Sequence, residues 1–317
     1  MVLLLIVLVV GFVAQLIDGS LGMGYGVLSM SLLLAAGVAP AVASATVHVA
    51  KIGTALASGT AHWRFGNVDG TMALLLGIPG AIGAYIGAVL LSNLSLEAAR
   101  PYVSIILFVL GGVIVARFIH GRRNRDNAPV APVERPKRPR WLLAPLGLIG
   151  GFVDASGGGG WGPVTTSTLV ASGRLEPRMT IGTVSAAELA VAIAASIGFI
   201  QSLGSAGVRW DITAAMLLGG VLAAPLAAWL VRHVNERTLG IAVGGLILWL
   251  SIDNLLTLLN FPEQILLPLR IAGLVVTVVL LFVAVFKTRR EQAAERADEA
   301  ESAATSAPAF DGGTGPD

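Results

Sequence analysis

The chain has 317 residues, of which 55% are hydrophobic and only 13% are charged, and its formal net charge is +2. Soluble domains carry about 25% charged residues, so a soluble fold of this size could not cover so much apolar surface. These figures exclude an ordinary cytosolic enzyme, a nucleic-acid-binding protein and a disordered chain. The absence of Cys excludes disulfides, thiolate metal sites and Cys nucleophiles. The sequence therefore indicates a multi-pass protein of the lipid bilayer.

Apolar segments follow one another along most of the chain. The first begins at residue 1 without a basic n-region or a clear cleavage site, so we expect it to stay in the mature protein. A helical span needs about 20 residues. Segments of that length are 41–60, 71–91, 101–119, 178–203, 212–231, 238–258 and 264–286. Shorter segments flank glycine clusters in pairs, namely 1–17 with 27–38 and 141–153 with 162–172.

Two polar segments orient the chain. Residues 120–140 are rich in Arg, Lys and Pro, and the positive-inside rule places them in the cytoplasm. The tail from residue 287 begins KTRR, becomes acidic and ends in small polar residues, which predicts a disordered cytoplasmic tail.

The chain contains an internal repeat, in which Gly11–Gly26 aligns without gaps to Gly147–Gly162. The matched pairs are Asp18 with Asp154, Ser20 with Ser156, Gly22 with Gly158, Gly24 with Gly160, Tyr25 with Trp161 and Gly26 with Gly162. After one inserted residue the match continues through Thr46 with Thr183, His48 with Ser185 and Lys51 with Glu188. An aspartate followed by alternating glycines at one offset indicates a duplication.

The number of spans fixes the topology. With 120–140 and KTRR both inside, the short pair 141–172 must enter and leave on one side. We therefore predict an all-α integral membrane protein with two inverted repeats, each a Gly-broken re-entrant helical hairpin plus three transmembrane helices, and one extra C-terminal transmembrane helix. The expected units are repeat 1–119, cytoplasmic loop 120–140, repeat 141–258, extra helix 259–286 and tail 287–317. The rival scheme makes each short pair one broken span and places KTRR outside.

The glycine breaks are the predicted binding site. Non-helical chain at membrane depth must be buried in protein or line a polar cavity. A half-helix that starts at such a break points N–H groups and a positive dipole end at it, and secondary transporters bind anions between two such ends. We expect hydroxyls and amides for an anion from Ser20, Gly22, Gly24, Ser156, Gly158 and Gly160, with Tyr25 and Trp161 as cavity walls. The alternative is that these glycines only let helices pack closely.

Five ionisable residues accompany the breaks. A charge at the bilayer centre costs about 3 kcal/mol or more, so Lys51 is expected to face an anionic substrate or to form an ion pair with Asp18 or Glu188. His48 lies three residues before Lys51, on the same helix face. We expect one of three roles for it: binding the substrate, relaying a proton, or forming a hydrogen bond as a core residue. Asp18, Asp154 and Glu188 are the proton-coupling candidates, and both aspartates could instead cap the second half-helices.

Three motifs resemble the TauE/SafE family of membrane permeases: DGSLGMGYG, AHWRFGNVD, and GGGGWGP with GTVSAAEL. The resemblance covers roughly residues 8–258. It implies transport of a small anion such as sulfite, a sulfonate or a related organic acid across a prokaryotic plasma membrane. The first repeat departs from the family in reading GMGYG where many relatives have three consecutive glycines, and the helix 264–286 lies outside the usual core.

We therefore predict a secondary transporter that works by alternating access, with proton coupling. It is not an enzyme, its partners are the anion and the bilayer, and we expect no cofactor, metal or nucleic acid; homo-oligomer formation stays open. Two other classes remain. The first is a lipid-phosphate hydrolase, which would require a Ser- and Arg-rich phosphate-binding motif. The second is a passive anion channel, which would conduct the anion without coupling to another ion.

Overall fold

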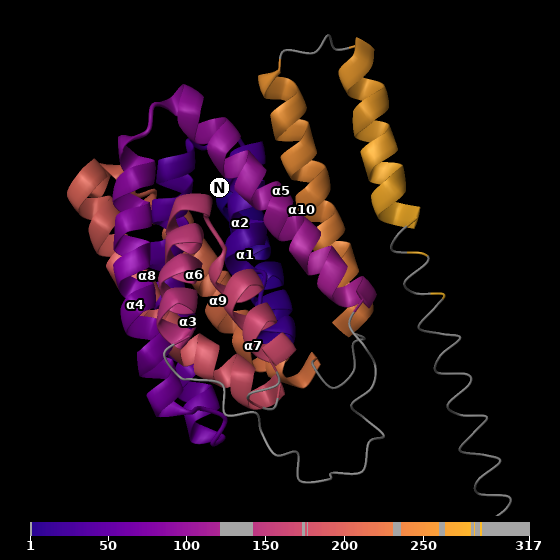
Figure 1. The fold of residues 1–317 in the computed structure, drawn as a ribbon. Coiled ribbons are helices and arrows are strands. Elements are labelled where there is room, and N and C mark those ends of the chain that lie inside the picture. The colour runs from indigo at the N-terminus through magenta and orange to yellow at the C-terminus, as the bar shows by residue number, and fades with distance from the viewer. Residues whose placement is uncertain are drawn as a thin grey trace, which may run out of the picture.

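The computed structural model describes residues 2–120, 142–172, 175, 177–230, 236–259, 264–279, 282 and 286. Every regular element in these ranges is helical (Figure 1), which confirms the all-α class. The α-helices are α1 (Val2–Leu21), α2 (Tyr25–Ala35), α3 (Pro40–Arg64), α4 (Gly70–Asn93), α5 (Leu96–His120), α6 (Leu143–Gly157), α7 (Ser167–Ser172), α8 (Pro177–Leu203), α9 (Trp210–Leu230) and α10 (Glu236–Leu258). A π-helical turn, η2 (Gly162–Thr166), precedes α7, and a 3-10 turn, η3 (Ser205–Gly207), precedes α9. The predicted loop beyond His120 and the tail 287–317 lie outside the described residues.

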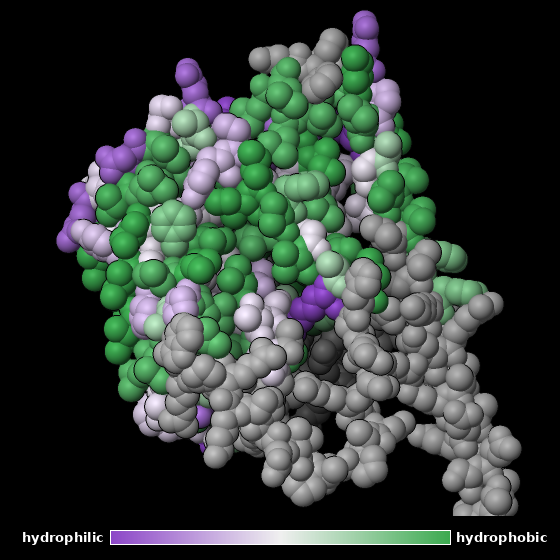
Figure 2. Space-filling view, in the orientation of Figure 1, coloured by the Kyte–Doolittle hydropathy of each residue, from purple (hydrophilic) through white to green (hydrophobic). Residues whose placement is uncertain are grey.

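Four helices are long and apolar enough to cross a membrane: Gly70–Asn93, Leu96–Ile119, Met179–Leu203 and Gly240–Leu258. Helix α3 has 25 residues, but it carries Lys51, His62 and Arg64 and is not one of the four. In Figure 2 hydrophobic side chains cover most of the visible face across its middle, and hydrophilic ones gather toward its edges. The chain is therefore a multi-pass membrane protein.

Helix α4 shows why the bundle packs without a polar outer face. Its large apolar side chains Leu74, Ile78, Ile82 and Ile86 are exposed at four-residue spacing. The buried residues of this helix are mostly small, and they include Gly77, Gly80, Gly83 and Gly87. A Cβ atom on Gly83 would lie 2.0 Å from the carbonyl oxygen of Leu148, so α4 and α6 are in backbone contact. Small residues allow this approach, and the large ones suit a lipid environment.

Helix pairs in the two halves of the chain match. Helix α4 packs along α6, and α9 packs along α1. A Cβ on Gly147 would lie 2.2 Å from the carbonyl oxygen of Leu76 in α4, and one on the aligned Gly11 would lie 2.6 Å from that of Met216 in α9. The first helix of each half therefore packs against a helix of the other half: α1 against α9, and α6 against α4.

Two hydrogen bonds between the halves match as well. The backbone N–H of Asp69, just before α4, donates to Thr183 Oγ1 in α8 at 3.0 Å. The backbone N–H of Arg209, just before α9, donates to the aligned Thr46 Oγ1 in α3 at 3.2 Å. These contacts fix the start of α4 to α8 and the start of α9 to α3.

The last described helix lies on the outside of the bundle. Helices α5 and α10 run side by side, and the helix Gln264–Val279 follows α10 (Figure 1). Trp249 Nε1 donates to the carbonyl oxygen of Arg270 at 2.9 Å, and the Arg270 side chain pairs with Asp253. The predicted extra helix is thus present over part of its range, and it lies away from the glycine breaks.

Candidate functional site

Each glycine cluster ends one helix in the same way. Gly22 follows α1 with φ of +68°, and its N–H donates to the Asp18 carbonyl at 2.7 Å. Gly158 follows α6 with φ of +83°, and its N–H donates to the Asp154 carbonyl at 2.7 Å. Glycine adopts this left-handed conformation without steric cost. The aligned sequences therefore form the same helix end.

The two aspartates also bind the start of the next helix. Asp18 Oδ1 accepts a hydrogen bond from the backbone N–H of Tyr25 at 3.2 Å, and Asp154 Oδ1 accepts one from the backbone N–H of Trp161 at 3.0 Å. A carboxylate is favourable at this positive end of a helix. Both half-helix starts thus already hold negative charge, and these two amides are not free for an incoming anion.

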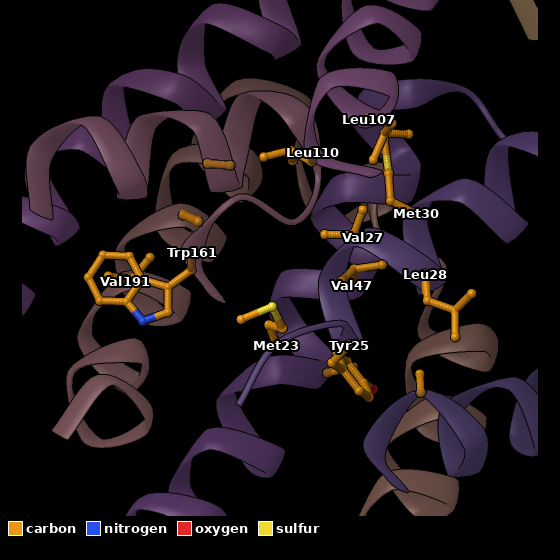
Figure 3. Close-up of a cluster of buried hydrophobic side chains, with 14 of the residues drawn as sticks. Met23, Tyr25, Val27, Leu28, Met30, Val47, Leu107, Leu110, Trp161 and Val191 are labelled. Atoms are coloured by element: carbon orange, nitrogen blue, oxygen red, sulfur yellow. The ribbon is translucent and has the colours of Figure 1, made fainter. Parts of the chain in front are cut away.

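The breaks pack directly against each other. A Cβ on Gly26 would lie 2.7 Å from Gly159 Cα, and one on Gly162 would lie 2.7 Å from Met23 Cβ. These contacts match, since Gly26 aligns with Gly162 and Met23 with Gly159. Figure 3 shows Met23 between Tyr25 of the first break and Trp161 of the second. The breaks therefore meet in the protein interior.

Lys51 is the centre of a buried charge cluster. Its Nζ lies 2.8 Å and 3.1 Å from the two carboxylate oxygens of Asp154, and 2.7 Å from Glu188 Oε1. The exposed side-chain fractions are 3% for Lys51, 0% for Asp154 and 15% for Glu188. The expected ion pair with Glu188 is present, and Asp154, which the sequence did not suggest as a partner, is the second acid.

His48 completes this cluster. Its Nδ1 lies 2.8 Å from the carbonyl oxygen of Ser44, and its Nε2 lies 3.1 Å from Asp154 Oδ2. The Ser44 hydroxyl donates elsewhere, to the carbonyl oxygen of Ala155 at 2.7 Å. Both ring nitrogens thus face acceptors, and a neutral imidazole has only one N–H. His48 is therefore held at both ring nitrogens, with Nε2 against Asp154.

A small pocket opens on one side of the cluster. It is lined by Gln15, Asp18, Tyr25, Lys51, Thr54, Ala55, Ser58 and Glu188. Four of these residues lie on one face of α3, from Lys51 toward the C-terminal end of that helix. The pocket therefore lies on the side of Lys51 and Glu188 that faces this end of α3, whereas Asp154 and His48 are fully buried.

The other predicted site residues lie around the breaks. Trp161 is buried, and its Nε1 donates to the Val184 carbonyl at 3.1 Å. The Ser156 hydroxyl accepts from Tyr102 Oη at 3.0 Å and donates to the Phe152 carbonyl at 2.7 Å. The carbonyls of Gly24 and Gly160 each accept the first hydrogen bond of the next helix. The Ser20 side chain lies outside the described residues.

Sequence reasoning missed three polar residues of the pocket, Gln15, Thr54 and Ser58. Gln15 and Asp18 lie three residues apart on α1, and Lys51, Thr54 and Ser58 follow one another at helical spacing on α3. This spacing around the singled-out Asp18 and Lys51 was the available signal. The described residues contain no group of three or more His, Cys, Asp or Glu side chains that could hold a metal ion.

Comparison with known proteins identifies the family of this chain. The profile of the family described as "Sulfite exporter TauE/SafE" matches residues 7–253. The chain belongs to the TauE/SafE family. It is 47% identical over 251 residues to the "Probable membrane transporter protein YtnM" of Bacillus subtilis (strain 168), an alignment that covers 79% of this chain and 81% of that protein. No solved structure matches the chain. The family and this relative indicate a membrane transporter, as the motifs suggested.

Proposed function

We propose that the protein is a secondary transporter for a small anion, of the class of sulfite, a sulfonate or a related organic acid, in a prokaryotic plasma membrane. The observation that carries the proposal is Lys51, a buried cation that lines a pocket beside the first glycine break and pairs with Asp154 next to the second. The family and its relative support transport. The substrate class follows from the family's description and from the positive charge of Lys51.

The matched contacts support an inverted-repeat architecture with alternating access. In such transporters the site lies where two repeats meet, and one repeat moves against the other around it. Here the breaks, the pairs α4 with α6 and α9 with α1, and the threonine hydrogen bonds are all matched in this way. In the proposed topology the C-terminal end of α3 is cytoplasmic. The pocket toward Ser58 then lies on the cytoplasmic side of Lys51.

Lys51 becomes available to an anion only when Glu188 withdraws. Both acids bind its ammonium, so an added anion would meet a lysine that is already neutralised. Glu188 is the more accessible acid and lines the pocket, whereas Asp154 also holds His48 and the N–H of Trp161. A proton on Glu188 would remove the negative charge that binds this side chain to Lys51. Anion and proton would then enter together, with Glu188 and Asp18 better placed than Asp154 to exchange the proton.

The first experiment is a thermal-shift screen of the purified protein against sulfite, sulfonates and carboxylates at equal ionic strength. An anion that raises the melting temperature is then used in proteoliposomes that contain the same anion on both sides. A carrier exchanges labelled anion without net flux, whereas a passive channel conducts a net current. Loss of exchange on neutralising Lys51 supports the proposed site; unchanged exchange rules it out.

A further inference from the structure

The buried cluster contains more acids than bases, and this inference deepens the transport function proposed above. Its acids are Asp18, Asp154 and Glu188, and its bases are Lys51 and His48. One acid is therefore left without a base to pair with. A bound anion would add a further negative group. Because uncompensated charge in an apolar interior is strongly unfavourable, the site needs a further positive charge before it can hold an anion.

The acid without a base to pair with is Asp18. Lys51 and His48 are both held by Asp154, and Lys51 is also held by Glu188. Asp18 accepts a backbone hydrogen bond from Tyr25, and no ion pair with Lys51 is formed among the described residues. It lies at the C-terminal end of α1, where the helix dipole adds partial negative charge. Asp18 and Glu188 line the same pocket, so their charges act on one volume.

Gln15 points to a ligand in that volume. It lies one turn before Asp18 on α1 and lines the pocket. The side chain is 3% exposed, and its Oε1 atom is buried without a hydrogen-bond partner in the part of the chain that the structure describes. A buried polar atom without a partner is costly. An amide oxygen that lines one pocket with two carboxyl groups has the chemistry of a cation ligand or of an acceptor for a protonated acid.

We propose that Asp18, Glu188 and Gln15 Oε1 form a site for one small monovalent cation, Na+ or a proton, beside Lys51. The cation neutralises Asp18 and draws Glu188 away from Lys51, which leaves the ammonium for the anion. Cation and anion then bind cooperatively, each raising the affinity for the other. The hydroxyls of Thr54 and Ser58 line the same pocket and can complete the oxygen shell around Na+.

The test uses the purified full-length protein in detergent. Its melting temperature is compared in NaCl, KCl and choline chloride at one concentration and pH, which keeps the anion constant. A second arm adds the transported anion in weakly buffered solution and follows proton uptake with a pH dye. We expect either stabilisation by Na+ over K+ or proton uptake with the anion. The effect should be lost in Asp18→Asn, reduced at least several-fold in Gln15→Leu and retained in Asp211→Asn, an exposed control outside the pocket.

Transport separates this inference from the proposed function. In proteoliposomes Asp18→Asn should lose accumulation driven by the Na+ or proton gradient, whereas Asp211→Asn should keep both this accumulation and anion exchange. Exchange without any response of the wild type to Na+ or to protons overturns the cation site and leaves anion transport intact. A full cation response in both Asp18→Asn and Gln15→Leu overturns it as well. If Asp18→Asn does not fold, Gln15→Leu decides by itself.

Discussion

Lys51 donates hydrogen bonds to both carboxylate oxygens of Asp154, 103 residues later in the chain, at 3.1 and 2.8 Å. Both side chains are buried, so the pair joins the middle of α3 to the break after α6. Removing one member of a buried pair leaves the other uncompensated and costs about 3–5 kcal/mol. A single substitution at either residue therefore confounds stability with function.

Neutralising both partners separates the two effects. We expect Lys51→Met alone to lower the melting temperature strongly, because Asp154 keeps its charge in an apolar interior. The double variant Lys51→Met, Asp154→Asn should recover much of that loss and still fail to bind or exchange the anion. Fluorescence-detected size exclusion, melting temperature and proteoliposome exchange measure these effects. Normal exchange by the folded double variant would remove Lys51 from the site.

Glu188→Gln should uncouple transport from a pH gradient. The amide keeps the size of the side chain and can still accept a hydrogen bond from Lys51, but it cannot exchange a proton. The net charge of this pair of side chains therefore stays constant through the transport cycle. Exchange of anion at equal concentrations is expected to continue, whereas accumulation driven by an imposed pH gradient should be lost. Asp253→Asn, at the outer pair with Arg270, is the matched control and should accumulate normally. Gradient-driven accumulation by Glu188→Gln at the wild-type level would exclude its coupling role.

Local patterns in the sequence predicted much of the fold. Apolar runs predicted the long helices, and Gly22 and Gly158 predicted the breaks because their left-handed backbone is local chemistry. The alignment of Asp18 with Asp154 predicted two equivalent residues, and they make the same backbone contacts. The charge on Lys51 in an apolar span predicted either an anionic substrate or an ion pair, and ion pairs with Asp154 and Glu188 are present.

Contacts between distant segments were not predictable in this way. The alignment gives Asp18 and Asp154 one local environment, yet only Asp154 binds Lys51 and His48, because α3 packs against the second break from one side. Gln15 looked like an ordinary polar residue in an apolar helix, and only the pocket shows that its Oε1 atom has no partner in the described structure. The sequence also treated the half-helix amides as free for an anion, whereas the aspartates bind those of Tyr25 and Trp161.

The contact between the breaks should not tolerate a methyl group. A Cβ on Gly159 would lie 2.1 Å from the backbone N of Val27, so Gly159→Ala must push the two breaks apart. We expect a large loss of thermal stability and of transport. Gly112→Ala is the matched control, since a Cβ there would meet nothing within 4 Å inside α5. Ala is favoured over Gly in a helix by about 1 kcal/mol, so this control should be neutral or slightly stabilising. Equal melting temperatures for both variants would contradict the packing of the breaks.

The matched threonine contacts should contribute equally to stability. Thr46→Val and Thr183→Val keep side-chain shape but remove the acceptors for the backbone N–H groups of Arg209 and Asp69. Both hydrogen bonds are only partly buried, and a typical hydrogen bond contributes about 0.5–1.5 kcal/mol to stability, so each variant should melt at a lower temperature, by a similar amount. Thr60→Val is the control, because that exposed hydroxyl donates only to the carbonyl of Leu56 in its own helix. The two bonds share no residue, so the losses should add in the double variant. A loss at one threonine with none at the other would show that the two halves are not held together symmetrically, and would weaken the inverted-repeat arrangement on which alternating access depends.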